Sequence, residues 1–184
     1  MKANRGIPRL LLVDAALFCC LIVAYLYLRH AASPWPRPFH FPSGLMTVAM
    51  IMFGGAVSFV VPVGERAAAA GDRLLSQRVL AAAVILWLTQ IFLLVIEWAR
   101  LYLAEQVHFL SNPWGKPALG ATYYTLSGFQ AVHVLAGIIW ATSVAQTPSQ
   151  SAAGSLRLYA LFTNGILVVI AFVVIFSATD LQGF

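Results

Sequence analysis

Charged residues are scarce in this chain of 184 residues, which has 11 Lys and Arg and only 6 Asp and Glu. Together they make up 9% of the sequence, whereas hydrophobic residues make up 61%. Soluble domains carry roughly 25% charged residues, so the composition indicates an integral membrane protein. The excess of basic residues does not indicate a nucleic-acid partner, because the Lys and Arg residues lie at the ends of apolar runs.

Residues that carry chemistry are also few. The sequence has no phosphate-binding glycine loop and no nucleophile beside a base. The only cysteines are the adjacent Cys19 and Cys20, which we expect to be packing residues, because neighbouring helical residues point about 100° apart and cannot share a metal. Only His133 lies deep in an apolar run, so a haem held by two intramembrane histidines is not expected. The other histidines, which fall in predicted loops, are His30, His40 and His108.

Five apolar runs long enough to cross a bilayer follow one another along the chain. They cover residues 10–28, 45–63, 79–101, 120–144 and 156–177. The first run is not expected to be a cleaved signal peptide, because it is too long, contains Asp14 and lacks a small-residue cleavage site. The sequence therefore predicts an all-α, integral membrane bundle of five transmembrane helices that forms a single domain over residues 1–184.

The connections between the runs are predicted to be short. The second run is expected to close near Pro62, because proline interrupts the hydrogen bonding of a helix. The predicted connections are a stiff proline-rich loop over 33–42, a loop over 64–78 with a few helical residues, an interfacial loop over 106–118 and a tight link over 147–155. No connection is long enough to hold a further domain.

The basic residues are unevenly divided between the two sides of the predicted bundle. The side that holds the N-terminus has seven, which are Lys2, Arg5, Arg9, Arg66, Arg73, Arg78 and Arg157. The opposite side has four, which are Arg29, Arg37, Arg100 and Lys116. Because cytoplasmic loops carry an excess of Lys and Arg, we expect a cytoplasmic N-terminus and a C-terminus outside.

Asp14 and His133 are ionisable residues that lie inside apolar runs, where polar groups need partners. Asp14 either supports packing near the interface or takes part in proton handling or pairing between helices. For His133, the simplest reading is a neutral imidazole bonded to a neighbouring helix. Counting residues from the ends of the runs places Asp14 roughly 6 Å deep and His133 roughly 16 Å deep, so a water or a tilted helix would have to join them.

Three further features concern helix packing. Gln130 shares the fourth run with His133 and must also find a partner on a neighbouring helix. Glu97 is expected to form an interfacial structural cluster with Arg100 on its own helix or with the hydroxyls of Tyr123 and Tyr124. Small residues that would let helix backbones approach closely are Gly54, Gly55 and Ser58 in the second run and Gly128, Ala131 and Gly137 in the fourth.

Three stretches, in this order and spacing, resemble subunit III of haem-copper terminal oxidases, the family found in cytochrome c and quinol oxidases. The first is the segment from Val13 to Phe18, which is followed by an A-Y-x-x-x-R pattern at residues 24–29. The second is the F-x-x-x-x-E-W pattern of residues 92–98. The third is Y-T-L-S-G-F at residues 124–129, followed by His133. The likeness corresponds to the short five-helix form of the family, without the two helices that hold lipid in longer members.

The chain departs from the family pattern at three polar positions. Asp14 stands where the family usually has glutamate, and Gln130 stands where a first histidine is common. Asn164 offers an amide where the family pattern would supply a charge. These departures thin the polar network, which favours a scaffolding role over a role in collecting protons.

The resemblance implies a non-catalytic accessory subunit of a respiratory complex that reduces O₂ to water and pumps protons. Its partners would be oxidase subunit I, with subunit II or other respiratory-complex subunits, and membrane lipids in the inner membrane of a bacterium. Haem and copper would belong to the partner subunits, and phospholipid would be bound here. The alternatives are an accessory subunit of a related nitric oxide reductase, a small transporter with Asp14 and His133 as a proton relay, and a membrane haem anchor.

Overall fold

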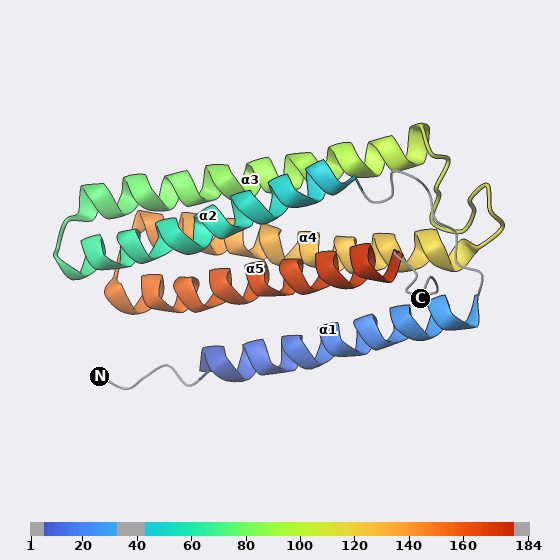
Figure 1. Ribbon diagram of the computed structural model, residues 1–184. Coiled ribbons are helices and arrows are strands. Elements are labelled where there is room, and N and C mark those ends of the chain that lie inside the picture. The colour runs from blue at the N-terminus through green and yellow to red at the C-terminus, as the bar shows by residue number, and fades with distance from the viewer. Residues whose placement is uncertain (1–5, 33–42, 179–184) are drawn as a thin grey trace.

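The computed structural model describes residues 6–32 and 43–178, and the described chain is helical with no strand (Figure 1). Five helices are long and apolar enough to cross a membrane. They are α1 (Gly6–Ala31), α2 (Gly44–Ala69), α3 (Arg73–Leu103), α4 (Pro117–Gln146) and α5 (Gln150–Ala178). The predicted all-α chain with five candidate membrane-spanning helices is therefore confirmed. The proline-rich loop over 33–42 lies outside the described residues.

Every helix extends beyond its apolar run, and two of the predicted connections are therefore too long. Helix α2 continues through Pro62 to Ala69, and α3 begins at Arg73, so residues 70–72 alone connect them. The predicted link over 147–155 shrinks to 147–149 for the same reason. The apolar pattern marks only the part of a helix inside the bilayer, whereas Ala and Arg, which favour helix, continue it into the polar region. His30, predicted in a loop, lies in the last turn of α1.

Helices α2 to α5 form a four-helix bundle, and α1 lies along one side of it (Figure 1). Helix α2 packs most extensively against α3 and α5, while α1 contacts only α4 and α5 among the described helices. Phe18 and Tyr25 are the side chains that α1 buries. The first helix is therefore attached to a bundle that is otherwise complete.

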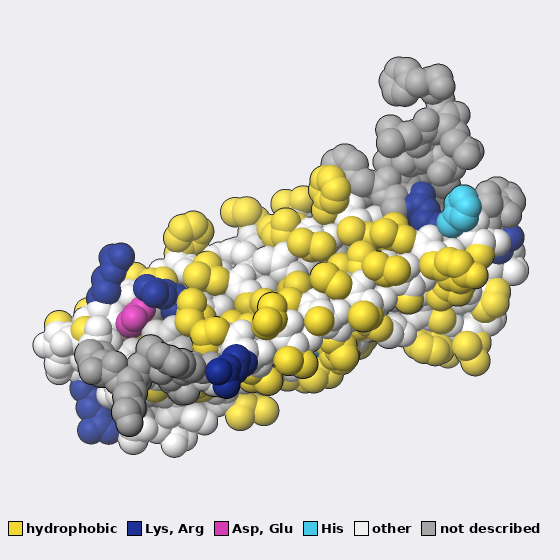
Figure 2. Space-filling view, turned by 90° about the horizontal axis from the view of Figure 1, so that it is seen from below, with side chains coloured by type: hydrophobic (Ala, Val, Ile, Leu, Met, Phe, Trp, Pro, Cys, Tyr) yellow, Lys and Arg dark blue, Asp and Glu magenta, His cyan; other side chains and the backbone are white. Residues whose placement is uncertain are grey.

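The outer surface has the pattern expected of a membrane protein. In Figure 2, which views the molecule from below, hydrophobic side chains cover the middle and charged side chains gather toward the two ends. The end where α1, α3 and α5 begin carries Arg9, Arg66, Arg73, Arg78 and Arg157. The opposite end carries Arg29, Arg100 and Lys116. The length and apolar character of the helices make this a multi-pass membrane protein.

Candidate functional site

Asp14 and His133 meet directly where α1 packs against α4. Asp14 Oδ2 lies 3.5 Å from His133 Nε2. The expectation that a water or a tilted helix must join them is wrong, because α1 begins at Gly6 and its start is displaced along the bundle from the turns that join the other helices (Figure 1). Asp14 is therefore eight residues into α1, roughly 12 Å from its start. The pairing between helices is the alternative that the structure realises.

Hydrogen bonds fix the orientation of His133 on α4. His133 Nδ1 lies 2.9 Å from the carbonyl oxygen of Phe129, so Nδ1 must carry a hydrogen to make this bond. His133 Nε2 then faces Asp14 Oδ2, and the contact is attractive only when a proton lies on one of these two atoms. The Tyr159 hydroxyl donates to the His133 carbonyl over 2.8 Å and ties α5 to the same turn of α4. These contacts fix the imidazole with Nε2 turned toward Asp14 and join α1, α4 and α5 at one turn of α4.

Aromatic rings close the inner side of the pair. The ring of Phe18, which is 1% exposed, has its centroid 5.1 Å from that of Phe129 and 5.0 Å from the imidazole of His133. On the other side lies an open groove of about 260 Å³ whose lining includes Asp14, His133, Trp140 and Tyr159. The Asp14 side chain keeps 25% of its surface exposed. The pair is therefore shielded from the bundle interior and open toward the surface beside α1.

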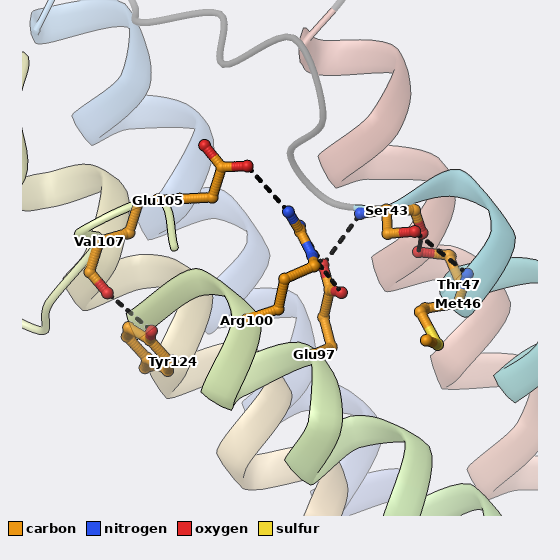
Figure 3. A network of polar contacts seen from close by, with 8 residues as sticks. All are labelled: Ser43, Met46, Thr47, Glu97, Arg100, Glu105, Val107 and Tyr124. Carbon is orange, nitrogen blue, oxygen red and sulfur yellow. Dashed lines mark hydrogen bonds and ion pairs between the residues drawn. The ribbon is translucent and has the colours of Figure 1, made fainter. Parts of the chain in front are cut away.

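Glu97 fixes the start of α2 to the end of α3 (Figure 3). Its side chain is completely buried, and its two oxygens lie 2.8 and 3.0 Å from the guanidinium nitrogens of Arg100. The backbone N–H of Ser43, the residue that caps α2, donates to Glu97 Oε1 over 2.9 Å. Glu105 contacts the same guanidinium at 3.0 Å. These contacts describe an interfacial structural cluster built on Arg100.

Of the two predicted arrangements of Glu97, the contact with Arg100 is found, and the Tyr124 hydroxyl has another partner. It donates instead to the Val107 carbonyl over 2.7 Å (Figure 3). This bond holds the loop that follows α3 against α4. A methyl group on Gly120 would collide with the backbone oxygen of His108, so the same loop also requires a glycine on α4. Sequence spacing could not supply these partners, because they depend on the path of the loop.

A second polar group lies at the centre of the four-helix bundle. Gln130 Nε2 donates to the Thr163 carbonyl over 2.9 Å and so connects α4 to α5. Asn164 and Gln90 both point toward Gly54: a Cβ atom there would lie 2.6 Å from Asn164 Oδ1 and 3.3 Å from Gln90 Oε1. Gln90 was not among the residues singled out from the sequence. An amide in the middle of the third apolar run was the signal that could have identified it.

The four glycines expected at helix contacts behave differently. At Gly54 and Gly137 an added Cβ would meet a neighbouring side chain at under 3.0 Å, namely Asn164 and Trp87. At Gly55 the nearest atom would be Asn164 Nδ2 at 3.9 Å, which is an ordinary contact. At Gly128 no atom would lie within 4 Å, so no close helix approach is found there. Of these four glycines, only Gly54 and Gly137 are therefore required by packing within this chain.

The donor groups in the described residues do not form a metal centre. No three His, Cys, Asp or Glu side chains in residues 6–32 and 43–178 are placed to hold an ion together. Cys19 and Cys20, expected to be packing residues, are both exposed on α1 and so do not pack within this chain.

No family model matches the chain, and no curated protein matches it. These comparisons identify no family for the chain, and the likeness to oxidase subunit III is a resemblance of three stretches of its sequence.

Proposed function

We propose that this chain is a non-catalytic accessory subunit of a haem-copper terminal oxidase. One observation carries the proposal: the residues of the resemblance, which lie far apart in the sequence, contact one another. Asp14 and Phe18 of the first stretch contact His133 and Phe129 of the third. Trp98 of the second stretch donates from Nε1 to the Ser127 hydroxyl of the third over 3.0 Å. Such mutual contacts are what a set of residues with a common structural role would have.

The exposed side of α1 supports a role in binding a partner subunit. Helix α1 buries only two of its side chains within the chain. Large apolar side chains elsewhere on it are widely exposed, including Leu12 at 72%, Val23 at 65% and Tyr27 at 71%. In a membrane, this surface is covered by lipid or by another subunit. We assign it to the catalytic subunit, with lipid in the remaining grooves.

Haem and copper belong to the partner subunits in this proposal, and O₂ reduction takes place there. This chain contributes a fixed helical surface and the Asp14–His133 pair beside it. The distribution of basic residues supports a cytoplasmic N-terminus and an external C-terminus. Insertion in a bacterial inner membrane belongs to the proposed respiratory role.

The test is purification of the full chain, carrying an affinity tag, from its native membranes in mild detergent. We expect a larger subunit with haem absorbance and copper to co-purify in a fixed ratio. Non-haem iron in place of copper would instead indicate a nitric oxide reductase assembly. A chain that purifies alone, or that binds haem by itself, would contradict the proposal.

A small proton-coupled transporter is the second candidate, because Asp14 and His133 are ionisable groups in contact and their pair opens onto a surface groove. Reconstitution of the chain alone in liposomes tests it. Proton-dependent solute uptake that is lost in Asp14→Asn would favour the transporter over the accessory subunit.

A further inference from the structure

Three buried carboxamide oxygens lack a hydrogen-bond partner at the centre of the bundle. They are Gln90 Oε1 on α3, Gln130 Oε1 on α4 and Asn164 Oδ1 on α5. Gln90 is 4% exposed and Gln130 is 3% exposed. Gln90 lies 13 residues from the nearer end of its helix and Gln130 also lies 13, about 20 Å along the axis. Bulk water does not reach this depth, and a buried acceptor left unpaired costs about 1–3 kcal/mol.

Turning the amide groups does not remove the problem. If the oxygen and nitrogen of Gln130 were exchanged, an oxygen would face the Thr163 carbonyl that now accepts a hydrogen bond. The orientation of Gln130 is therefore fixed by this bond. Exchanging the oxygen and nitrogen of the Gln90 amide would bring a donor toward Asn164, since both side chains lie against Gly54. Gln130 Oε1 would still lack a hydrogen-bond donor.

A cavity of about 50 Å³ adjoins Gln90 and Gln130. One water needs roughly 10–15 Å³ of such space, so a few waters fit, whereas an acyl chain needs far more. The hydroxyls of Thr47 and Ser127 also line the cavity, but they already donate to backbone carbonyls of their own helices. None of the described residues that line the cavity is charged, so a cation would enter without a counter-charge.

We propose that Gln90 and Gln130 form a buried binding site for ordered water. The water donates to Gln90 Oε1 and Gln130 Oε1 and so joins α3 to α4 at mid-depth. Among the described residues, the Gln90 and Gln130 side chains make no direct hydrogen bond to each other. A neutral donor fits this site because the unmet groups of Gln90 and Gln130 are carboxamide oxygens, which accept, and no described residue that lines the cavity is charged. The site is independent of the oxidase proposal, since it lies inside the bundle and involves no partner.

The experiment is a cryo-electron microscopy map of the full chain with its bound partners, at a resolution that shows ordered water. We expect density about 2.7–3.2 Å from Gln90 Oε1 or Gln130 Oε1. An empty cavity, in a map that shows other buried waters, would overturn the proposal. Density of a coordinated metal ion or a lipid chain would overturn it as well. The wild-type map decides the matter whether or not any variant assembles.

A second measurement uses infrared spectra recorded in H₂¹⁶O and H₂¹⁸O. We expect the wild-type protein to show a buried-water band that shifts with the isotope and is lost in Gln90→Leu. The matched control is Thr89→Val, because the Thr89 hydroxyl bonds to the Ile85 carbonyl of its own helix. The control should keep the band. A band that is equally strong in Gln90→Leu would place the water elsewhere and contradict the assignment.

Discussion

Gly137 and Gly128 lie on the same helix, yet a methyl group should have opposite effects at the two positions. A Cβ atom on Gly137 would lie 2.9 to 3.1 Å from three carbons of the Trp87 ring. That ring is 1% exposed, so it has no free space into which it can move. A Cβ atom on Gly128 would meet nothing within 4 Å. We therefore predict that Gly137→Ala destabilises the bundle and that Gly128→Ala does not.

The magnitude follows from two opposing terms. Replacing a helical glycine by alanine stabilises a helix by about 0.5–1 kcal/mol, and this gain is common to both variants. Inserting a carbon into a packed core costs about 1–3 kcal/mol, and only Gly137→Ala incurs this cost. The difference between the variants is therefore about 1–3 kcal/mol. For a chain of this length it corresponds to roughly 2–12 °C between their melting temperatures.

The assay is thermal unfolding of the purified protein in one detergent, followed by helical circular dichroism for wild type and both variants. We expect Gly128→Ala to melt at or slightly above the wild-type temperature and Gly137→Ala to melt below it. The packing of α4 on Trp87 would be refuted if the two variants melted at the same temperature. A larger loss for Gly128→Ala than for Gly137→Ala would refute it more strongly.

Four further predictions concern the polar groups and a glycine that packs against one of them. Glu97→Ala should lower the free energy of unfolding by about 1.5–3 kcal/mol, because it leaves Arg100 and the start of α2 without their shared hydrogen-bond partner. Asp14→Asn should mildly impair the stability or sustained turnover of the complex, measured as O₂ consumption over time. His133→Ala should loosen assembly, measured by co-purification, without changing the haem spectrum per complex. Gly54→Ala should lower the melting temperature, because its methyl would meet Asn164 at 2.6 Å.

Two of these variants, Glu97→Ala and Gly54→Ala, have a control in the same region. Glu105→Ala should cost less than Glu97→Ala, since the Glu105 side chain is 26% exposed and Arg100 would keep its other partner. Gly55→Ala should leave the melting temperature nearly unchanged, because its nearest neighbour would be 3.9 Å away. Unimpaired stability and turnover in Asp14→Asn would mean that the pair with His133 has no role in the complex. An altered haem spectrum in His133→Ala would place His133 next to the haem.

The number and order of helices could be predicted because they depend on a simple physical requirement. Twenty or so apolar residues that cross a bilayer must form a helix, so the five runs identify five helices. The ends could not be predicted from hydropathy, because residues such as those after Pro62 are polar or small and yet continue the helix in water. The displacement of α1 along the bundle was also hidden, since it depends on packing against α4 and α5. That displacement brings Asp14 to His133.

The polar contacts divide in a similar way. Glu97 with Arg100 could be predicted, because residues three apart on a helix are neighbours. The bond from Ser43 to Glu97 could not, because the two residues are 54 positions apart and one partner is a backbone group. Gln90 was overlooked although an amide inside an apolar run always needs a partner. Gly128 resembled the other glycines in sequence, and only the positions of neighbouring helices distinguish it from Gly137.

Native mass spectrometry of the assembly, released from its own membranes, tests the central claim most directly. The account predicts a complex in which one copy of this chain accompanies a larger subunit that carries haem and copper. When the complex is dissociated in the instrument, this chain should leave at the mass of the bare polypeptide, with or without lipid. Detection of the chain only by itself or as a homo-oligomer, or with haem or metal retained on it, would contradict the account.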